Sequence, residues 1–138
     1  METGPQRGAA LVEMALVTPF LVLLLIGVVE SSYLLMRSID IATASREAGR
    51  LASVNHGDLD AIKDGACLSM DFPTGASFTL TGSGNGLGGT INATATQSVG
   101  TLTGLLDNLF SPPINLSRTA IFRLEAPTAT WSDGSDSC

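Results

Sequence analysis

Residues 14–29 read MALVTPFLVLLLIGVV, an uncharged stretch that decides the architecture of the chain. A helix rises about 1.5 Å per residue, so this stretch alone reaches about 24 Å, short of the roughly 30 Å hydrocarbon core of a bilayer. Residues 9–12 and 31–36 add the missing length, provided that Glu13 and Glu30 lie toward the two interfaces. We therefore predict a transmembrane helix over residues 9–36.

Two other structures produce an apolar stretch of this kind. A buried core helix would need cover on all sides, and the rest of the chain, rich in Gly, Ser, Thr and Asp, offers little. A cleaved secretory signal fits Arg7 ahead of the apolar residues, but no small-x-small cleavage site follows Val29. We favour a retained membrane anchor.

Two residues within the apolar stretch need an explanation. A carboxylate such as Glu13 costs roughly 2.5 to 3.5 kcal/mol at the centre of a bilayer and less near an interface, so it should have a partner, unless it lies at headgroup level. Pro19 lacks an amide hydrogen and crowds the carbonyl four residues earlier, so we expect a helix kink there.

Composition excludes several classes of function. The chain has 138 residues, with 7 Lys and Arg against 13 Asp and Glu and a net charge of −6. The length leaves no room for a two-domain enzyme with a cofactor-binding half, and the acidic balance argues against nucleic acid as a partner. The single histidine, His56, has no metal-ligand spacing around it. We expect no catalytic residues, no metal and no cofactor.

The helix is expected to continue beyond the membrane as a stalk over residues 37–56. Apolar residues recur there at spacings of three and four, which is the helical period. They are Ile41, Ala44, Ala48, Leu51 and Ala52. This stripe either packs on the protein's own domain or offers a narrow face to neighbouring subunits.

The remaining residues, 57–138, predict a small α+β domain. Asp58 to Met70 has the pattern of a short helix, and residues 101–110 that of a short helix or turn. Alternating side chains predict strands over residues 76–81, 90–99 and 114–125, the first two joined by the glycine-rich residues 82–89. About three antiparallel strands covered on one face by helical residues would form the domain.

Three segments together resemble the TadE-like family, minor pilin-like proteins of the bacterial tight-adherence (Tad/Flp) pilus. They are RGAALVEMALVTPF at residues 7–20, GVVE at residues 27–30 and ASREAGR at residues 44–50. The resemblance covers about a third of the chain. In addition, LSRTAIFRLE at residues 116–125 is similar to the strand that often closes these domains.

The resemblance implies a role for the first residues of the chain. Residues 1–8 would form a leader that a prepilin peptidase removes between Gly8 and Ala9. Glu13 would then be the fifth residue of the mature chain, where its carboxylate can pair with the amino terminus of a neighbouring subunit and set the register of an assembly. Pilin-like substrates of the Flp type usually carry Glu-Tyr here, whereas this chain has Glu13-Met14.

The resemblance also implies a location. The protein would cross the bacterial inner membrane once, with residues 57–138 in the periplasm or outside the cell. The protein could also be part of the pilus itself. Counting Arg7 against Arg37, Arg46 and Arg50 favours the opposite orientation, and we follow the resemblance. In an oxidising periplasm Cys67 and Cys138 could form a disulfide; the alternative is a buried Cys67 and a free Cys138.

The sequence thus predicts a structural or assembly component of a tight-adherence pilus. Its partners would be the membrane, the prepilin peptidase, other pilin-like subunits and the assembly machinery. One alternative is a single-pass envelope protein whose outer domain binds a ligand or partner. Another is a small envelope hydrolase that uses a serine with His56.

Overall fold

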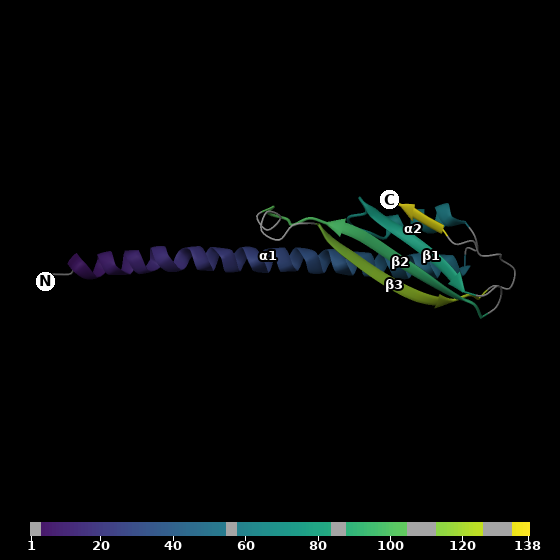
Figure 1. Ribbon diagram of the computed structural model, residues 1–138, viewed down its shortest axis with the longest axis horizontal. Coiled ribbons are helices and arrows are strands. Elements are labelled where there is room, and N and C mark those ends of the chain that lie inside the picture. The colour runs from purple at the N-terminus through teal and green to yellow at the C-terminus, as the bar shows by residue number, and fades with distance from the viewer. Residues whose placement is uncertain (1–3, 55–57, 84–87, 105–112, 126–133) are drawn as a thin grey trace.

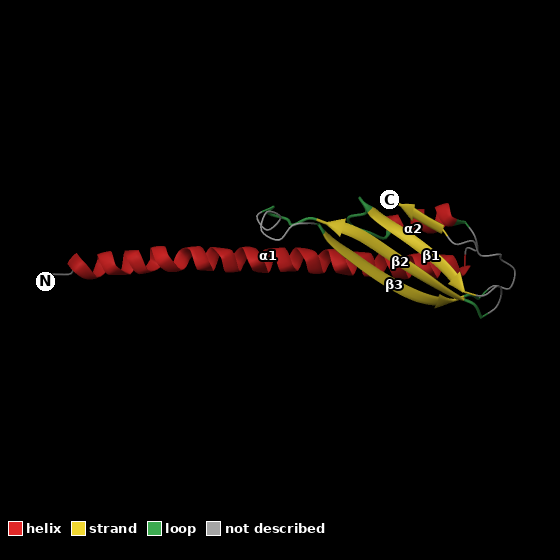
Figure 2. Ribbon diagram, viewed as in Figure 1, coloured by secondary structure: helices red, strands yellow, loops and turns green. Residues whose placement is uncertain are grey.

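The computed structural model describes residues 4–54, 58–83, 88–104, 113–125 and 134–138. One long helix, one short helix and a four-stranded antiparallel sheet form an α+β structure, which confirms the predicted fold class (Figures 1 and 2). The elements are α1 (Gly4–Val54), α2 (Leu59–Leu68), β1 (Ala76–Ser83), β2 (Thr90–Val99), β3 (Ile114–Arg123) and β4 (Gly134–Ser137).

The predicted continuation of the apolar helix into the stalk is confirmed, because both regions belong to one helix, α1, of 51 residues. Its N-terminal half extends alone, and its C-terminal half lies along the sheet (Figure 1). The helix continues through Pro19. The kink expected there stays a prediction.

The C-terminal half of α1 packs on the protein's own domain, which decides between the two alternatives for the stalk stripe. Four residues of the stripe are fully buried: Ile41, Ala44, Ala48 and Ala52. A side chain added at Gly49 would overlap the Phe122 ring, so glycine is what allows α1 to approach β3 this closely. Small side chains set the distance between helix and sheet.

The strand order of the sheet is β3-β2-β1-β4. The alternation predicted for residues 90–99 is confirmed, because Ile91, Ala93, Ala95, Gln97 and Val99 are buried. Asp58 caps α2 by accepting a hydrogen bond from the Ala61 amide at 3.1 Å, as an N-cap residue should. Residues 101–104 are not helical; residues 105–110, like His56, lie outside the described residues.

The expectation of about three strands is wrong by one, since the described residues include the fourth strand β4. Its sequence, Gly-Ser-Asp-Ser, has no apolar alternation to reveal it. Backbone pairing with β1, from Ser77↔Ser137 to Leu80↔Gly134, holds β4 at the sheet edge. A strand held by backbone pairing, rather than by burial of its own side chains, carries no hydrophobic pattern.

Candidate functional site: the free half of α1 and its junction with the domain

The free half of α1, residues 8–29, has the composition of a membrane span. An 18-residue window within this helix has a mean hydropathy of 2.5, and no part of it is buried. Large apolar side chains are exposed along the whole segment, among them Leu11, Leu16, Phe20, Leu24 and Val28. By length and composition this helix can cross a bilayer once.

The residues at the predicted cleavage point lie near the start of this free half. Gly8 and Ala9 are exposed, and a side chain added at Gly8 would meet no atom within 4 Å. The helix begins at Gly4, so the predicted leader and the helix that follows are continuous. Cleavage between Gly8 and Ala9 stays a prediction.

Glu13 is the only charged residue between Gly8 and Val29. It is exposed, and within the described part of the chain no hydrogen bond or ion pair involves it. A carboxylate among aliphatic side chains needs a partner when water is removed. No such partner for Glu13 lies among the described residues.

Glu30, the first residue after the apolar stretch, has a different environment. It is 3% exposed, and its carboxylate accepts hydrogen bonds from the backbone amides of Leu102 at 2.9 Å and Thr103 at 2.8 Å. The Thr103 hydroxyl donates a third bond to the same carboxylate. The sequence predicts Glu30 near a membrane interface but not this contact, since backbone amides 72 and 73 residues away leave no sequence signal.

Asp40 repeats the arrangement ten residues further along α1. Its two carboxylate oxygens accept hydrogen bonds from successive backbone amides, those of Asp71 at 3.0 Å and Phe72 at 3.2 Å. Glu30 and Asp40 therefore each bind a connecting segment of the domain to α1. Charge-assisted bonds of this kind are stronger than neutral ones, so both contacts help to hold the domain in one position on the helix.

Arg37 lies between these two acids and joins the same connection. Its guanidinium donates to the Tyr33 hydroxyl at 2.8 and 3.1 Å and to the Phe72 carbonyl at 3.3 Å. It also lies over the Phe72 ring, 4.2 Å from the ring centre. Stacking on an aromatic face suits a guanidinium, which is more weakly hydrated than an ammonium group.

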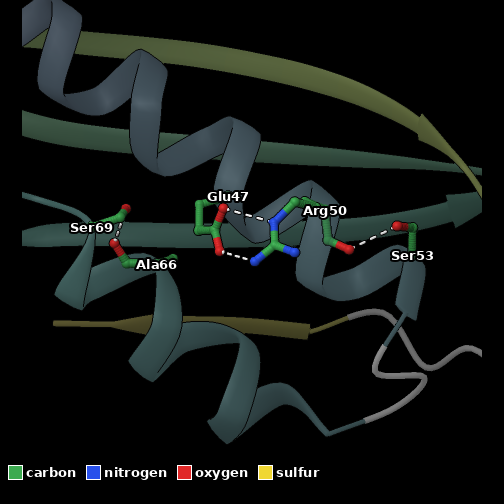
Figure 3. Close-up of polar contacts among 5 residues, drawn as sticks. All are labelled: Glu47, Arg50, Ser53, Ala66 and Ser69. Carbon is green, nitrogen blue, oxygen red and sulfur yellow. Dashed lines mark hydrogen bonds and ion pairs between the residues drawn. The ribbon is translucent and has the colours of Figure 1, made fainter.

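Two ion pairs lie further from the free half. Arg50 donates two hydrogen bonds to Glu47 on the surface of α1 (Figure 3), and these bonds lower the pKa of Glu47. Lys63 on α2 donates to Asp136 on β4 at 3.0 Å. The Ser137 amide and Lys63 together lower the pKa of Asp136. Both ion pairs join residues of the folded protein to each other, so we interpret them as structural contacts.

Cys67 and Cys138 are joined by a disulfide that links the last turn of α2 to the residue that follows β4. The described ranges contain no group of three or more His, Cys, Asp or Glu side chains that could hold a metal ion. A shallow hollow of about 420 Å³ follows one side of α1, lined by Leu35, Met36, Ile39 and Asp40, among others. Two acids line this hollow, Asp40 and Asp71, and the Asp40 carboxylate is already bound to two backbone amides.

The model of the TadE-like protein family matches residues 8–50. No curated protein and no solved structure matches the chain. The matched segment lies within α1 and contains Gly8, Ala9, Glu13, Pro19 and Glu30, whereas α2 and the whole sheet lie outside it. The likeness thus covers the free half of α1 and most of the half that carries the domain.

Proposed function

We propose that this chain, with its TadE-like segment over residues 8–50, is a membrane-anchored pilin-like subunit that takes part in assembling a tight-adherence pilus. The observation that carries the proposal is the division of α1. One half is apolar, has no buried residue and contains a single unpaired acid, while the other half is built into a folded domain. A subunit whose helix spans the membrane and whose domain lies outside the membrane requires this architecture.

Glu13 is the residue we assign to subunit pairing. It has no partner among the described residues, and a bilayer or a packed helix bundle would leave its charge unsatisfied. Removal of residues 1–8 by a prepilin peptidase would create an amino group at Ala9, four residues before Glu13. A neighbouring subunit could then supply that amino group to the Glu13 carboxylate. Such a pair fixes the axial offset between two otherwise smooth apolar helices.

The location that we propose is the inner membrane, with residues 57–138 on the periplasmic or outer side. The disulfide supports it, because such bonds persist in oxidising compartments. The arginine count favours the reverse orientation. However, Arg37 and Arg50 are engaged in contacts within the protein, and long domains translocate largely regardless of charge.

The first test is the mass and N-terminal sequence of the protein purified from membranes of cells that contain a tight-adherence pilus system. A mature chain that starts at Ala9 supports processing as a prepilin. The same cells without the prepilin peptidase should yield the uncut chain. A chain that keeps residues before Gly8 in both strains would contradict processing. A start beyond Glu30 would show that the apolar segment is a secretory signal.

The second test separates pairing from folding. Glu13→Gln removes the charge from the free half of α1 and should abolish pilus assembly, while the protein still inserts and folds. Glu47→Gln is the matched control, since it removes a carboxylate from the surface of the same helix outside the apolar stretch. Co-purification of other pilus subunits is the readout. Equal recovery of partners with both variants would overturn the role of Glu13.

A further inference from the structure

The segment Thr101–Gly104 is held against α1 where the apolar stretch ends. Glu30 directly follows Val29, and its buried carboxylate accepts hydrogen bonds from the Leu102 and Thr103 amides. Figure 1 shows this segment, coloured green, as the described part of the domain that reaches furthest toward the free half of α1. The contact with Glu30 fixes the position of this segment along α1.

Two described segments at the end of the domain that faces the free half of α1 carry no charge and expose two aliphatic side chains. Residues 99–104 and 113–117 contain no Asp, Glu, Lys or Arg. Leu102 is 56% exposed, and Ile114 at the start of β3 is 42% exposed. The opposite end of β3 carries Arg123 and, two residues later, Glu125. Arg118, in the middle of β3, donates to the Ser38 hydroxyl at 2.9 Å, so the charged residues of this strand lie beyond its first four residues.

The length of the free half places these uncharged segments at a membrane surface. The 21 residues from Ala9 to Val29 would extend about 32 Å as a helix, close to the roughly 30 Å hydrocarbon core of a bilayer. Glu30 then lies at the boundary, and the segment bound to it lies at the same level. Moving an exposed leucine at that level from water into the boundary between headgroups and acyl chains lowers the free energy.

We propose that Thr101–Gly104 is a second membrane contact, in which Leu102 enters the interfacial layer of the bilayer and Glu30 holds the backbone that carries it. The inference rests on the transmembrane anchor proposed above. A segment at the interface needs its backbone amides satisfied, and the Glu30 carboxylate satisfies two of them. Attachment at both α1 and this segment would restrict the tilt of the domain relative to the membrane.

The test uses the full chain in vesicles of phosphatidylcholine and phosphatidylglycerol, with one spin label per variant. Leu102→Cys reports on the proposed contact. Ile121→Cys is the matched control, an aliphatic residue on β3 that is 70% exposed, and Leu21→Cys reports on the span. The native cysteines are joined to each other, so labelling without reductant marks only the added thiol. Collision rates with oxygen and with a water-soluble nickel chelate are compared at each position.

We expect the ratio of oxygen to nickel collisions to be several-fold higher at position 102 than at position 121, and highest at position 21. Adding Glu30→Ala should lower the ratio at 102 toward that at 121, with no change at 21. A label at 102 that is as open to nickel as at 121, or shielded from both reagents by protein, overturns the inference while position 21 still reports an anchor. A label at 21 open to nickel would show instead that the anchor itself fails.

Discussion

The two halves of α1 share one continuous backbone and differ in the size of the side chains that they present. Between Gly8 and Val29 the side chains are mostly large and aliphatic, and none is buried. Between Glu30 and Val54 the side chains buried against the domain are mostly small, with Ile41 the one large aliphatic residue among them. Small side chains allow close approach to a sheet, whereas large ones cover apolar surface for lipid or other helices.

The polar residues follow the same division. Glu30 and Asp40 each accept two backbone amide hydrogen bonds from the domain, while Glu13 has no contact within the described residues. The carboxylates of Glu30 and Asp40 are therefore part of the fold, whereas for Glu13 we propose a partner on a neighbouring subunit. Matched substitutions in the two halves can test this comparison directly.

The largest effect is expected when a small buried residue is enlarged. Ala48 is fully buried between α1 and the sheet, so Ala48→Leu must separate the two and should lower the free energy of unfolding by about 3 kcal/mol. Ala15→Leu, the same change in the free half, should leave it unaltered. Urea unfolding of the full chain in detergent micelles, followed by circular dichroism, provides the measurement. Equal effects at both positions would break the comparison.

Glycine offers a second matched pair. Alanine favours a helix over glycine by about 1 kcal/mol, so Gly27→Ala in open surroundings should leave the domain's stability unchanged or slightly raise it. At Gly49 the new methyl group would meet the Phe122 ring of β3, and we expect a net loss of about 2 kcal/mol. The same unfolding assay measures both. Restoration of stability by Phe122→Leu in the Gly49→Ala protein would assign the loss to this contact, and stabilisation by Gly49→Ala alone would contradict it.

The acids provide a third pair, with two opposite readouts. Asp40→Ala leaves the Asp71 and Phe72 amides without their acceptor and should lower the free energy of unfolding by about 1 kcal/mol, since water can partly replace the carboxylate. Glu13→Ala should leave unfolding unchanged and abolish pilus assembly. Loss of domain stability in Glu13→Ala would show that this acid serves the fold after all.

The sequence was sufficient for elements whose side chains alternate or recur with a clear period. The long helix, the buried face of β2 and the small-residue stripe of the stalk were all predicted in this way. Periodicity identifies which residues share a face but not what covers that face, so it left the stalk stripe with two alternatives. The roles of Glu30 and Asp40 depend on backbone amides that are distant in sequence, and β4 depends on pairing with β1. Such contacts arise only when the chain has folded.

The smallest effect concerns the outer surface of the domain-bearing half, where burial contributes least. Hydrogen bonds from Arg50 lower the pKa of Glu47 below its ordinary value of 4.5, so the folded state binds a proton less readily than the unfolded state. The stability from this pair is therefore fully present above about pH 4.5 and is lost as the pH falls through the lowered pKa. For a surface pair of this spacing the contribution is about 0.3 to 0.5 kcal/mol.

Glu47→Gln should reduce the free energy of unfolding by that amount at pH 7 and by less at pH 3, because the falling pH approaches the lowered pKa of Glu47. Urea unfolding at the two pH values measures the difference, and Glu125→Gln, which changes an exposed acid at the end of β3, serves as the control. A loss of more than about 1 kcal/mol at pH 7 would show that this exposed surface of α1 stabilises the domain as its buried face does. The difference in stability would then lie only between the two halves of α1, and no longer between the exposed and buried faces of the domain-bearing half.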